Sequence, residues 1–505
     1  MTDSAAVAAP AAGVTATTAT TAGPASSSGP ASSSGPASSS GPASSSGPAS
    51  FVLRARHVLT MGAAGHVRDG AVAVVDGRIA AVDGYAAIAA RFADLPVVGD
   101  GGGIITPGFV SCHGHFSEGL VTGIGETHTL WEWFVHVVEP IEAHLTRDMA
   151  YVGTLLKATE MALSGVTTVG DMFCSAPGTP PITPGIVDAL DVVGVRGDVS
   201  FGPADFPHGY PVDRIVAEHH ALAHAAAASR RTRFRVGLAT VPSSSDALLA
   251  ATRSLLAETD RLHVHLHEVR EEVTASRTSR GASSIEVAAR AGLLDAQTVA
   301  AHCVWLSDDD VALLRRHAVA VAHCPVSNMI LASGVCQVPR LLREAVPVGL
   351  GVDGAASNDS QDMLETVKAA ALLQKVHHQQ ADVLTAPAVL RMATLGGARA
   401  LGLDDTVGSL DVGKAADLVL FAEASPSMAF VHDPYQAVVY CAGTRDIAGV
   451  WVDGERIVAD ARILTADIPA ILPRARELAV ELATRAGLAS ELAASPTRPP
   501  ACPEG

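Results

Sequence analysis

The stretch 262–268 reads LHVHLHE, in which three histidines alternate with apolar residues and a carboxylate follows. Alternation with a period of two is typical of a β-strand, so we expect the imidazoles of His263, His265 and His267 to share one face. Three imidazoles on one face crowd proton-binding groups together unless a metal ion or a ligand occupies them. A strand with a wet, polar face is the alternative interpretation, and the stretch alone does not decide between the two.

Histidines and acids also lie at or just beyond the ends of other apolar runs of the chain. Short apolar runs alternate with helical stretches between residues 106 and 405, which predicts a parallel β/α architecture. Eight such runs end at Cys112, Asp171, Phe201, Val241, His267, Cys303, Cys324 and Asp353. Eight β/α units in about 250 residues or more are what a TIM barrel needs, and active sites of such barrels lie at the carboxyl ends of the strands.

The two ends of the chain share a different texture of short strands and tight turns. Near the N-terminus the expected strands are 51–59, 71–75 and 79–82, and near the C-terminus they are 416–421, 447–452 and 455–458. An Asp-Gly pair forms the turn in each set, at 76–77 and at 453–454. We therefore expect an α/β protein with a (β/α)8 barrel over 106–405 and a small β-sandwich domain built from 51–105 and 406–465, with Trp451 in its core.

Residues outside these domains are of simple composition. Residues 1–50 are mostly Ala, Thr, Ser, Pro and Gly, and a Gly-Pro-Ala-Ser-Ser-Ser hexamer repeats from Gly23 onward. Such a segment buries too little apolar area to offset its ordering entropy, so we expect a disordered tail. A helix is expected over 466–490, followed by a Pro-rich tail over 491–505.

Charge and cysteine content exclude several classes of partner. The formal net charge of −17 argues against nucleic acids and anionic membranes, which bind basic patches. No apolar run approaches the roughly 20 residues of a membrane span, and the N-terminus does not resemble a secretory signal. Seven scattered cysteines without a C-x-x-C pair are typical of reduced thiols, so we expect a cytoplasmic protein and no cysteine-ligated zinc.

Histidines and one aspartate at the strand ends offer a ligand set for a metal. His113 and His115 form an H-x-H after the first strand, a spacing that places two imidazoles on the same side. A third histidine from the 262–268 stretch and Asp353 would complete a set of three nitrogens and one oxygen. That set suits zinc, iron or manganese, and an open coordination position would hold a water whose pKa the metal lowers. The spacing does not decide which of the three alternating histidines is the ligand.

Five ordered motifs resemble those of the amidohydrolase superfamily, in its aminohydrolase branch together with chlorohydrolase relatives. The motifs are TPGFVSCHGH at 106–115, HLHE at 265–268, AHC at 301–303, AHCPVSN at 322–328 and VDGAASND at 352–359. The resemblance covers roughly residues 51–460. It includes S-adenosylhomocysteine and methylthioadenosine deaminases, 8-oxoguanine deaminases and triazine chlorohydrolases.

This resemblance implies roles for individual residues. Its H-x-x-E pattern makes His265 the ligand and Glu268 the catalytic carboxylate. One divalent ion, with Zn²⁺ as first choice and Fe²⁺ or Mn²⁺ as alternatives, would then be held by His113, His115, His265 and Asp353. His302 and Asp353 would orient or deprotonate the metal-bound water. Glu268 would protonate a ring nitrogen and later pass a proton to the leaving amine.

Three further residues are candidates for contact with a substrate. Trp133 lies in the loop after the first strand, where it would stack on a flat heterocycle. Glu142 matches a position that contacts ribose in the nucleoside deaminases. His323 matches a motif for which either a substrate contact or a structural hydrogen bond is expected.

The chain departs from the nucleoside deaminases in two places. Residues 239–244 read ATVPSS where those enzymes place a histidine before Ser-Pro, and an arginine usual near the third strand is replaced around Phe201. Residues 322–374 look closer to 8-oxoguanine deaminases and triazine hydrolases. The predicted function is therefore a metal-dependent hydrolytic deaminase of an aminated N-heterocycle, which is a purine base, a nucleoside, a pterin or a triazine.

The sequence favours two other functions less. A chlorohydrolase or another C–N hydrolase of s-triazine-like rings is the alternative, but chloride leaves without a proton and therefore needs Glu268 and His302 less. A non-catalytic scaffold is disfavoured because no metal-ligand position is lost. We expect a small-molecule substrate and a homo-oligomer.

Overall fold

The computed structural model describes residues 50–206, 209–295 and 297–488. The tails expected at 1–50 and 491–505 fall outside this range, apart from Ser50. Among the described helices, none is long and apolar enough to cross a membrane.

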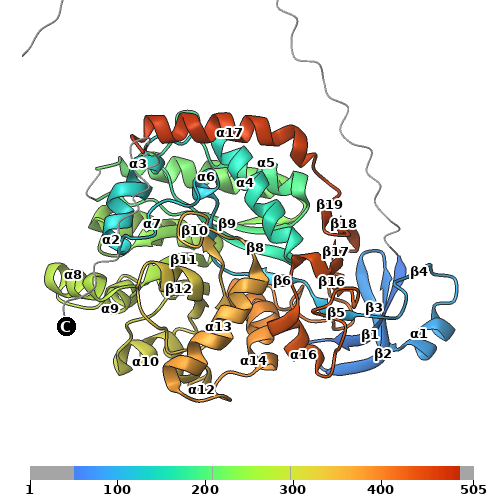
Figure 1. The fold of residues 1–505 in the computed structure, drawn as a ribbon. Coiled ribbons are helices and arrows are strands. Elements are labelled where there is room, and N and C mark those ends of the chain that lie inside the picture. The colour runs from blue at the N-terminus through green and yellow to red at the C-terminus, as the bar shows by residue number, and fades with distance from the viewer. Residues whose placement is uncertain (1–49, 207–208, 296, 489–505) are drawn as a thin grey trace, which may run out of the picture. The chain divides into compact units, whose positions relative to one another are not determined.

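Eight parallel strands close into a barrel in the order β10-β11-β12-β13-β14-β6-β8-β9, which confirms the predicted (β/α)8 architecture (Figure 1). Every residue of β8 is buried, as expected for a strand packed on both faces. The strands end close to the positions predicted from the sequence. Their bounds are β6 Phe109–Ser111, β8 Val166–Phe173, β9 Arg196–Phe201, β10 Thr232–Thr240, β11 Arg261–Leu266, β12 Gln297–His302, β13 Ala320–His323 and β14 Val348–Leu350.

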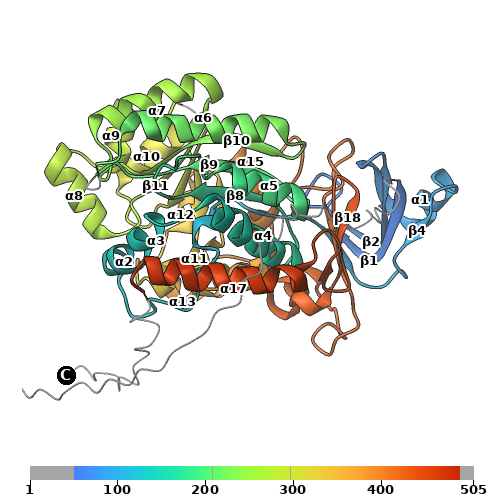
Figure 2. The same ribbon diagram turned by 90° about the horizontal axis from the view of Figure 1, so that it is seen from above.

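Helices surround the barrel and connect its strands (Figures 1 and 2). Several begin at a side-chain cap; Ser307, for example, accepts a hydrogen bond from the backbone N–H of Asp310. A π-helical segment at Met392–Gly396 lies between α14 and α15. The bounds are α4 Arg147–Leu163, α5 Pro184–Val193, α6 Val212–Ala228, α7 Asp246–Thr259, α8 Arg270–Arg280, α9 Ser284–Arg290, α10 Asp308–Arg316, α11 Pro325–Ile330, α12 Val338–Arg343, α13 Met363–His378, α14 Ala386–Arg391 and α15 Gly397–Leu401.

Strands from both ends of the chain form one sheet of nine strands, in the order β19-β18-β17-β16-β5-β1-β2-β3 with β4 beside β1. The two ends meet where β5 pairs with β16 in antiparallel register. Trp451 is buried in an apolar cluster that both sets of strands share, 5.9 Å from the ring of Phe51. The bounds are β1 Phe51–Leu59, β2 His66–Val75, β3 Arg78–Gly84, β4 Val97–Val98, β5 Ile104–Pro107, β16 Leu418–Phe421, β17 Ile447–Val452, β18 Glu455–Ala459 and β19 Arg462–Ile463.

The last helix, α17 at Ile468–Arg485, lies beside α4 on the outside of the barrel (Figure 2). Arg474 of this helix makes an ion pair with Asp148 of α4, with 2.6 Å between Nη2 and Oδ2. The helix expected at 466–490 is thus present and ends at Arg485.

A buried ion pair lies inside the barrel, below the level of the strand ends. The Arg235 guanidinium of β10 donates from Nε to Asp198 Oδ1 of β9 at 2.9 Å, and both side chains are inaccessible to solvent. Arg235 also donates from Nη2 to the carbonyl of Leu401 at the end of α15, at 2.8 Å. These contacts join the barrel to a helix that lies beyond its last strand.

Candidate metal centre and active-site cavity

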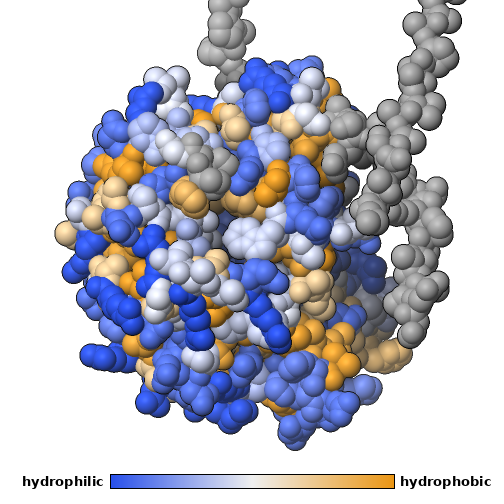
Figure 3. All heavy atoms as spheres, turned by 90° about the vertical axis from the view of Figure 1, so that its left-hand side faces the viewer, coloured by the Kyte–Doolittle hydropathy of each residue, from blue (hydrophilic) through white to orange (hydrophobic). Residues whose placement is uncertain are grey.

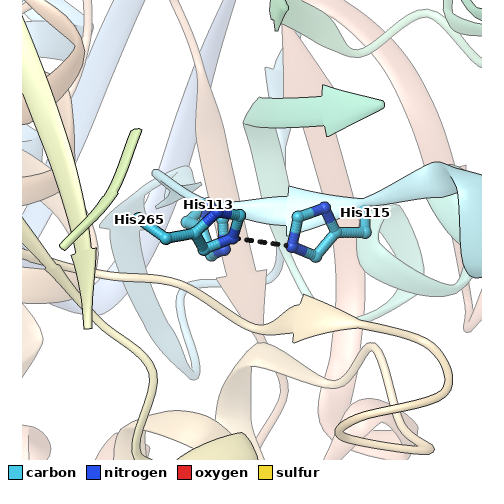
Figure 4. A group of neighbouring side chains, drawn as sticks. All are labelled: His113, His115 and His265. Carbon is cyan, nitrogen blue, oxygen red and sulfur yellow. Dashed lines mark hydrogen bonds between the residues drawn. The ribbon is translucent and has the colours of Figure 1, made fainter. Parts of the chain in front are cut away.

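A two-stranded parallel pair brings His115 and Asp353 together beyond the ends of the first and last barrel strands. The pair consists of β7, Gly114–His115, and β15, Asp353–Gly354. Figure 4 shows His113, His115 and His265 gathered at this place. The carboxylate of Asp353 lies 3.3 Å from His113 Nε2 and 3.5 Å from His115 Nε2. The structure thus assembles the four predicted ligands from three distant parts of the chain.

Two imidazole nitrogens meet in a way that calls for a cation between them. His115 Nδ1 lies 2.6 Å from the carbonyl oxygen of Met172, and His265 Nδ1 lies 2.8 Å from that of Ala239. A carbonyl only accepts, so each ring carries its hydrogen on Nδ1 and a lone pair on Nε2. Burial lowers the pKa of His115 to about 4 and holds that of His265 well below its usual value, so neither ring gains a second proton.

The two Nε2 atoms are nevertheless 3.1 Å apart, which places one lone pair against the other (Figure 4). Nitrogens bound to one zinc ion at about 2.0–2.1 Å are themselves roughly 3 Å apart. The His113 Nε2 atom is buried without a hydrogen-bond partner and belongs to the same group. The donor set of three neutral imidazoles and one carboxylate therefore fits a divalent metal ion.

Asp353 is held as an anion. Burial by itself raises the pKa of this carboxyl, but His113, His302 and His115 outweigh that effect and bring the pKa well below its usual value. Asp353 and His302 both have φ of +69°, a left-handed backbone that non-glycine residues adopt at a cost. Such strained residues are concentrated at functional sites.

Glu268 and His302 form a buried pair beside the metal-binding group. Glu268 Oε2 lies 3.4 Å from His302 Nε2, and His302 Nε2 lies 3.8 Å from Asp353 Oδ2. Burial raises the pKa of Glu268 to about 7. Burial also lowers the pKa of His302, but the carboxylates of Glu268 and Asp353 outweigh it, and the net shift is upward.

Two polar side chains hold this pair in place. His302 Nδ1 lies 2.9 Å from Asn328 Oδ1, and Ser333 Oγ donates to Glu268 Oε1 at 3.3 Å. Asn328 belongs to α11 and Ser333 to the loop that follows it. Ser333 is in none of the sequence motifs, and no local signal marks it as part of a site.

The three alternating histidines of the 262–268 stretch separate in the structure. His265 joins the metal-binding group, and His263 contacts His113 from deeper in the barrel. Strand β11 ends at Leu266, and His267 has φ of +55°, with its Nδ1 bonded to the carbonyl of Trp305 at 3.0 Å. The expected common face therefore does not extend to His267, because the chain leaves the strand before that residue.

A cavity of about 880 Å³, including the open solvent at its mouth, lies over the metal-binding group. Its wall is largely aromatic and aliphatic, and part of it comes from α2, Leu130–Trp133, and the π-helical segment Phe134–Val138 that follows. The face that carries α2 and α8 is mostly hydrophilic with smaller hydrophobic groups between (Figure 3). The lining residues that matter here are His115, Glu118, Leu130, Trp131, Trp133, Phe134, Val138, Glu142, Cys174, Thr240, Ser243, His265, Glu268, Glu272, His302 and Asp353.

The three predicted substrate contacts have different placements. Trp133 lines the cavity and donates from Nε1 to the carbonyl of Ala356 at 3.0 Å. Glu142 also lines it, and burial together with the charge of Glu139 raises its pKa to about 8. His323 is fully buried behind the wall, and neither of its ring nitrogens has a hydrogen-bond partner. It is not among the lining residues, and its pKa is lowered by burial to about 3.

Glu118 is a buried acid that the sequence analysis missed. Its Oε2 accepts a hydrogen bond from the backbone N–H of Ala356 at 2.7 Å, so it fastens the loop that follows Asp353. A Cβ atom at Gly354 would lie 2.0 Å from the same oxygen, which explains why glycine follows Asp353. Burial raises the pKa of Glu118 well above its usual value.

A closed parallel barrel with three imidazoles, an aspartate and a second acid at the carboxyl ends of its strands defines the class of metal-dependent barrel hydrolases. Comparison with known proteins gives the family. The model of a family described as "Amidohydrolase family" matches residues 104–457. The chain belongs to the amidohydrolase family and is a hydrolytic enzyme, as the sequence motifs predicted.

Similar proteins carry several activities in their names. A 5-methylthioadenosine/S-adenosylhomocysteine deaminase of Desulforudis audaxviator is 36% identical over 85% of this chain and 99% of its own length. A 5'-deoxyadenosine deaminase of Methanothermobacter thermautotrophicus is 36% identical over 77% of this chain and 90% of its own.

Solved structures add two further likenesses. A zinc-bound adenosine deaminase of Xanthomonas campestris has a TM-score of 0.79 and 29% identity, over 86% of this chain and 98% of its own. A zinc-bound atrazine chlorohydrolase of Arthrobacter aurescens has a TM-score of 0.79 over 85% of this chain and all of its own, and at 24% identity it shows the fold alone.

Proposed function

We propose that this protein is a zinc-dependent deaminase that hydrolyses the exocyclic amine of an adenine-type nucleoside. The observation that carries the proposal is the Glu268–His302 pair, 3.4 Å apart and beside the metal-binding group in the floor of the cavity. The deaminase names of the relatives at 36% identity support the reaction and the substrate class. Zinc in the similar adenosine deaminase structure supports the choice of metal.

In this proposal His113, His115, His265 and Asp353 hold one zinc ion. The backbone carbonyls of Met172 and Ala239 fix two of the rings with their Nε2 lone pairs toward the ion. When bound, the ion supplies a water molecule whose lowered pKa makes it a nucleophile at neutral pH.

Glu268 acts as the proton donor to the ring. A carboxyl with a pKa of about 7 is partly protonated at neutral pH and is able both to give and to take a proton. Protonation of the ring nitrogen next to the amine-bearing carbon lets that carbon accept the nucleophile, because the ring nitrogen then takes up the electron pair. His302 and Asp353 take the proton that the nucleophile loses, and ammonia leaves after it has gained one. The overall reaction consumes one water and converts the C–NH₂ group to a carbonyl.

Trp133 and Glu142 position the nucleoside. Trp133 forms part of the aromatic wall and contacts the base, and its hydrogen bond to Ala356 keeps it oriented. Glu142 hydrogen-bonds the sugar hydroxyls. The apolar side chains of Leu130 and Phe134 line the same cavity and accommodate an uncharged substituent on the sugar.

One feature of the sequence and one structural likeness keep the substrate range wider than adenosine itself. Thr240 and Ser243 line the cavity in the ATVPSS stretch that departs from the nucleoside deaminases. The triazine hydrolases share the fold, and a chloride leaving group is the second candidate reaction. Retention of Glu268 favours the amine, since chloride needs no proton to leave. His323 has a structural place in this proposal, behind the wall.

The test is a parallel assay of ammonia and chloride release by the zinc-loaded full-length chain. The substrates are 5'-methylthioadenosine, 5'-deoxyadenosine, adenosine, S-adenosylhomocysteine, guanine, 8-oxoguanine, a pterin, and amino- and chloro-triazines. Release of ammonia from an adenine nucleoside supports the proposal. Release of chloride without ammonia, or ammonia only from a triazine, pterin or guanine-type base, contradicts it. A homo-oligomeric state and a cytoplasmic location stay predictions from the sequence.

A further inference from the structure

His263 lies in the barrel interior below the metal-binding group and has no place in the proposed reaction. It is fully buried, and its Nε2 lies 2.8 Å from His113 Nδ1. On its other side, His263 Nδ1 lies 3.4 Å from the hydroxyl of Ser200. The three residues come from β9, β11 and the segment after β6, so the barrel closure is what joins them.

The donor and acceptor in each of these contacts follow from the position of the hydroxyl hydrogen of Ser200. Ser200 Oγ donates its single hydrogen to the carbonyl of Asp171 at 2.8 Å, so toward His263 it offers only a lone pair. His263 then carries its hydrogen on Nδ1 and accepts at Nε2. His113 must therefore donate from Nδ1, which leaves a lone pair on its Nε2.

The opposite tautomer of His263 would leave two lone pairs facing each other. With the hydrogen of His263 on Nε2, its bare Nδ1 would oppose the Ser200 oxygen, whose hydrogen is already used by Asp171. A hydrogen on His113 Nε2 would also find no geometrically acceptable partner, because that atom has no hydrogen bond although Asp353 is 3.3 Å away. Buried polar atoms without partners are costly, so the first assignment is favoured.

We infer that His263 is a positioning residue which, with Ser200 behind it, fixes the tautomer and orientation of His113 for metal binding. A metal binds only the nitrogen that has a lone pair, and His113, unlike His115 and His265, has no backbone carbonyl at Nδ1. The side chains of His263 and Ser200 thus fix the Nδ1 hydrogen of His113, as main-chain carbonyls fix those of His115 and His265. The inference rests on the proposed metal centre and is independent of the substrate.

Zinc affinity of four single variants tests the inference, measured by competition with a chromophoric chelator on the full chain. His263→Phe removes the acceptor at similar size and is expected to weaken zinc binding about 10- to 100-fold. His263→Gln keeps an acceptor near the Nε2 position and is expected to restore most of the loss. Ser200→Ala is expected to weaken binding in the same direction by a smaller factor.

His267→Phe is the matched control, because His267 is equally buried in the same stretch but bonds to Trp305. It is expected to bind zinc within a few-fold of the wild type. An unchanged affinity in a folded His263→Phe protein overturns the inference, as does an equal loss in His267→Phe. If His263→Phe does not fold, wild-type affinity in Ser200→Ala overturns it. A wild-type chain that binds no zinc would instead contradict the metal centre itself.

Discussion

Glu268 Oε2 lies 3.4 Å from His302 Nε2 at the floor of the cavity, although Glu268 follows β11 and His302 ends β12. The pair is buried, with one member an acid of raised pKa and the other an imidazole within 3.8 Å of Asp353. Hydrolytic deamination requires an acid and a base that both lie within reach of the reacting carbon and its leaving group.

Replacement of Glu268 by glutamine is expected to lower kcat by about 10²- to 10⁴-fold, because the amide neither gives nor takes the proton. Zinc content and melting temperature are expected to stay as in the wild type, since Glu268 is outside the ligand set. Steady-state ammonia release and metal analysis of the same sample check this. Turnover of the variant at the wild-type rate would remove Glu268 from the mechanism.

Removal of the metal is expected to abolish activity and to lower the melting temperature. Ligand lone pairs such as those of His115 and His265, 3.1 Å apart, repel each other without a cation between them. The measurement is calorimetry before and after chelation, followed by titration with Zn²⁺. Recovery is expected to saturate at one ion per chain, and saturation at two would show that a second site contributes.

Trp133→Phe is expected to raise KM about 5-fold, the cost of one lost hydrogen bond of roughly 1 kcal/mol. The bond in question is the one to the Ala356 carbonyl, in the loop that follows Asp353. Trp131→Phe is the control, because Trp131 also lines the cavity. Equal effects of the two substitutions on KM would show that the size of the aromatic side chain matters, and not the orientation that the hydrogen bond gives to Trp133.

Glu142 predicts a pH dependence of stability. Its pKa of about 8 in the folded chain lies above the ordinary value of 4.5, so the folded state holds this proton more tightly. The stabilisation is fully present below pH 4.5 and is lost as the pH rises toward 8. Glu142→Gln is therefore expected to gain unfolding free energy relative to the wild type at pH 8 but not at pH 4.5. Urea denaturation of the zinc-free proteins measures this, and a pH-independent difference would contradict the raised pKa.

Arg235→Met is expected to lower the unfolding free energy by about 1–3 kcal/mol, because the buried carboxylate of Asp198 loses one of its two guanidinium partners and keeps only Arg233. The double variant with Asp198→Leu is expected to recover part of that loss. Zinc stoichiometry is expected to be unchanged in both, since the pair lies away from the ligands. Denaturation curves check the stability, and a loss below about 1 kcal/mol for Arg235→Met would show that the pair is readily replaced.

Much of the architecture follows from local patterns in the sequence. The apolar runs ending near Cys112, Asp171 and Asp353 are strands because strand burial on both faces needs continuous apolar residues. The H-x-H at 113–115 and the alternation around His265 also place side chains at strand ends by local geometry alone. The positions of the candidate ligands along the chain were therefore predictable without knowledge of the fold, but the choice of His265 among the three alternating histidines came only from the family resemblance.

Contacts between distant residues depend on the closure of the barrel, and no local period encodes them. The sequence by itself determined that the chain has eight β/α units with histidines and acids at their ends, because alternation and strand ends are properties of neighbouring residues. Only the tertiary structure decided that His267 turns away after Leu266, that His263 supports His113 across 150 positions, and that Glu118 fastens the loop after Asp353. Each of these depends on where a strand stops and which strands it then faces, and both are set by packing of the whole barrel.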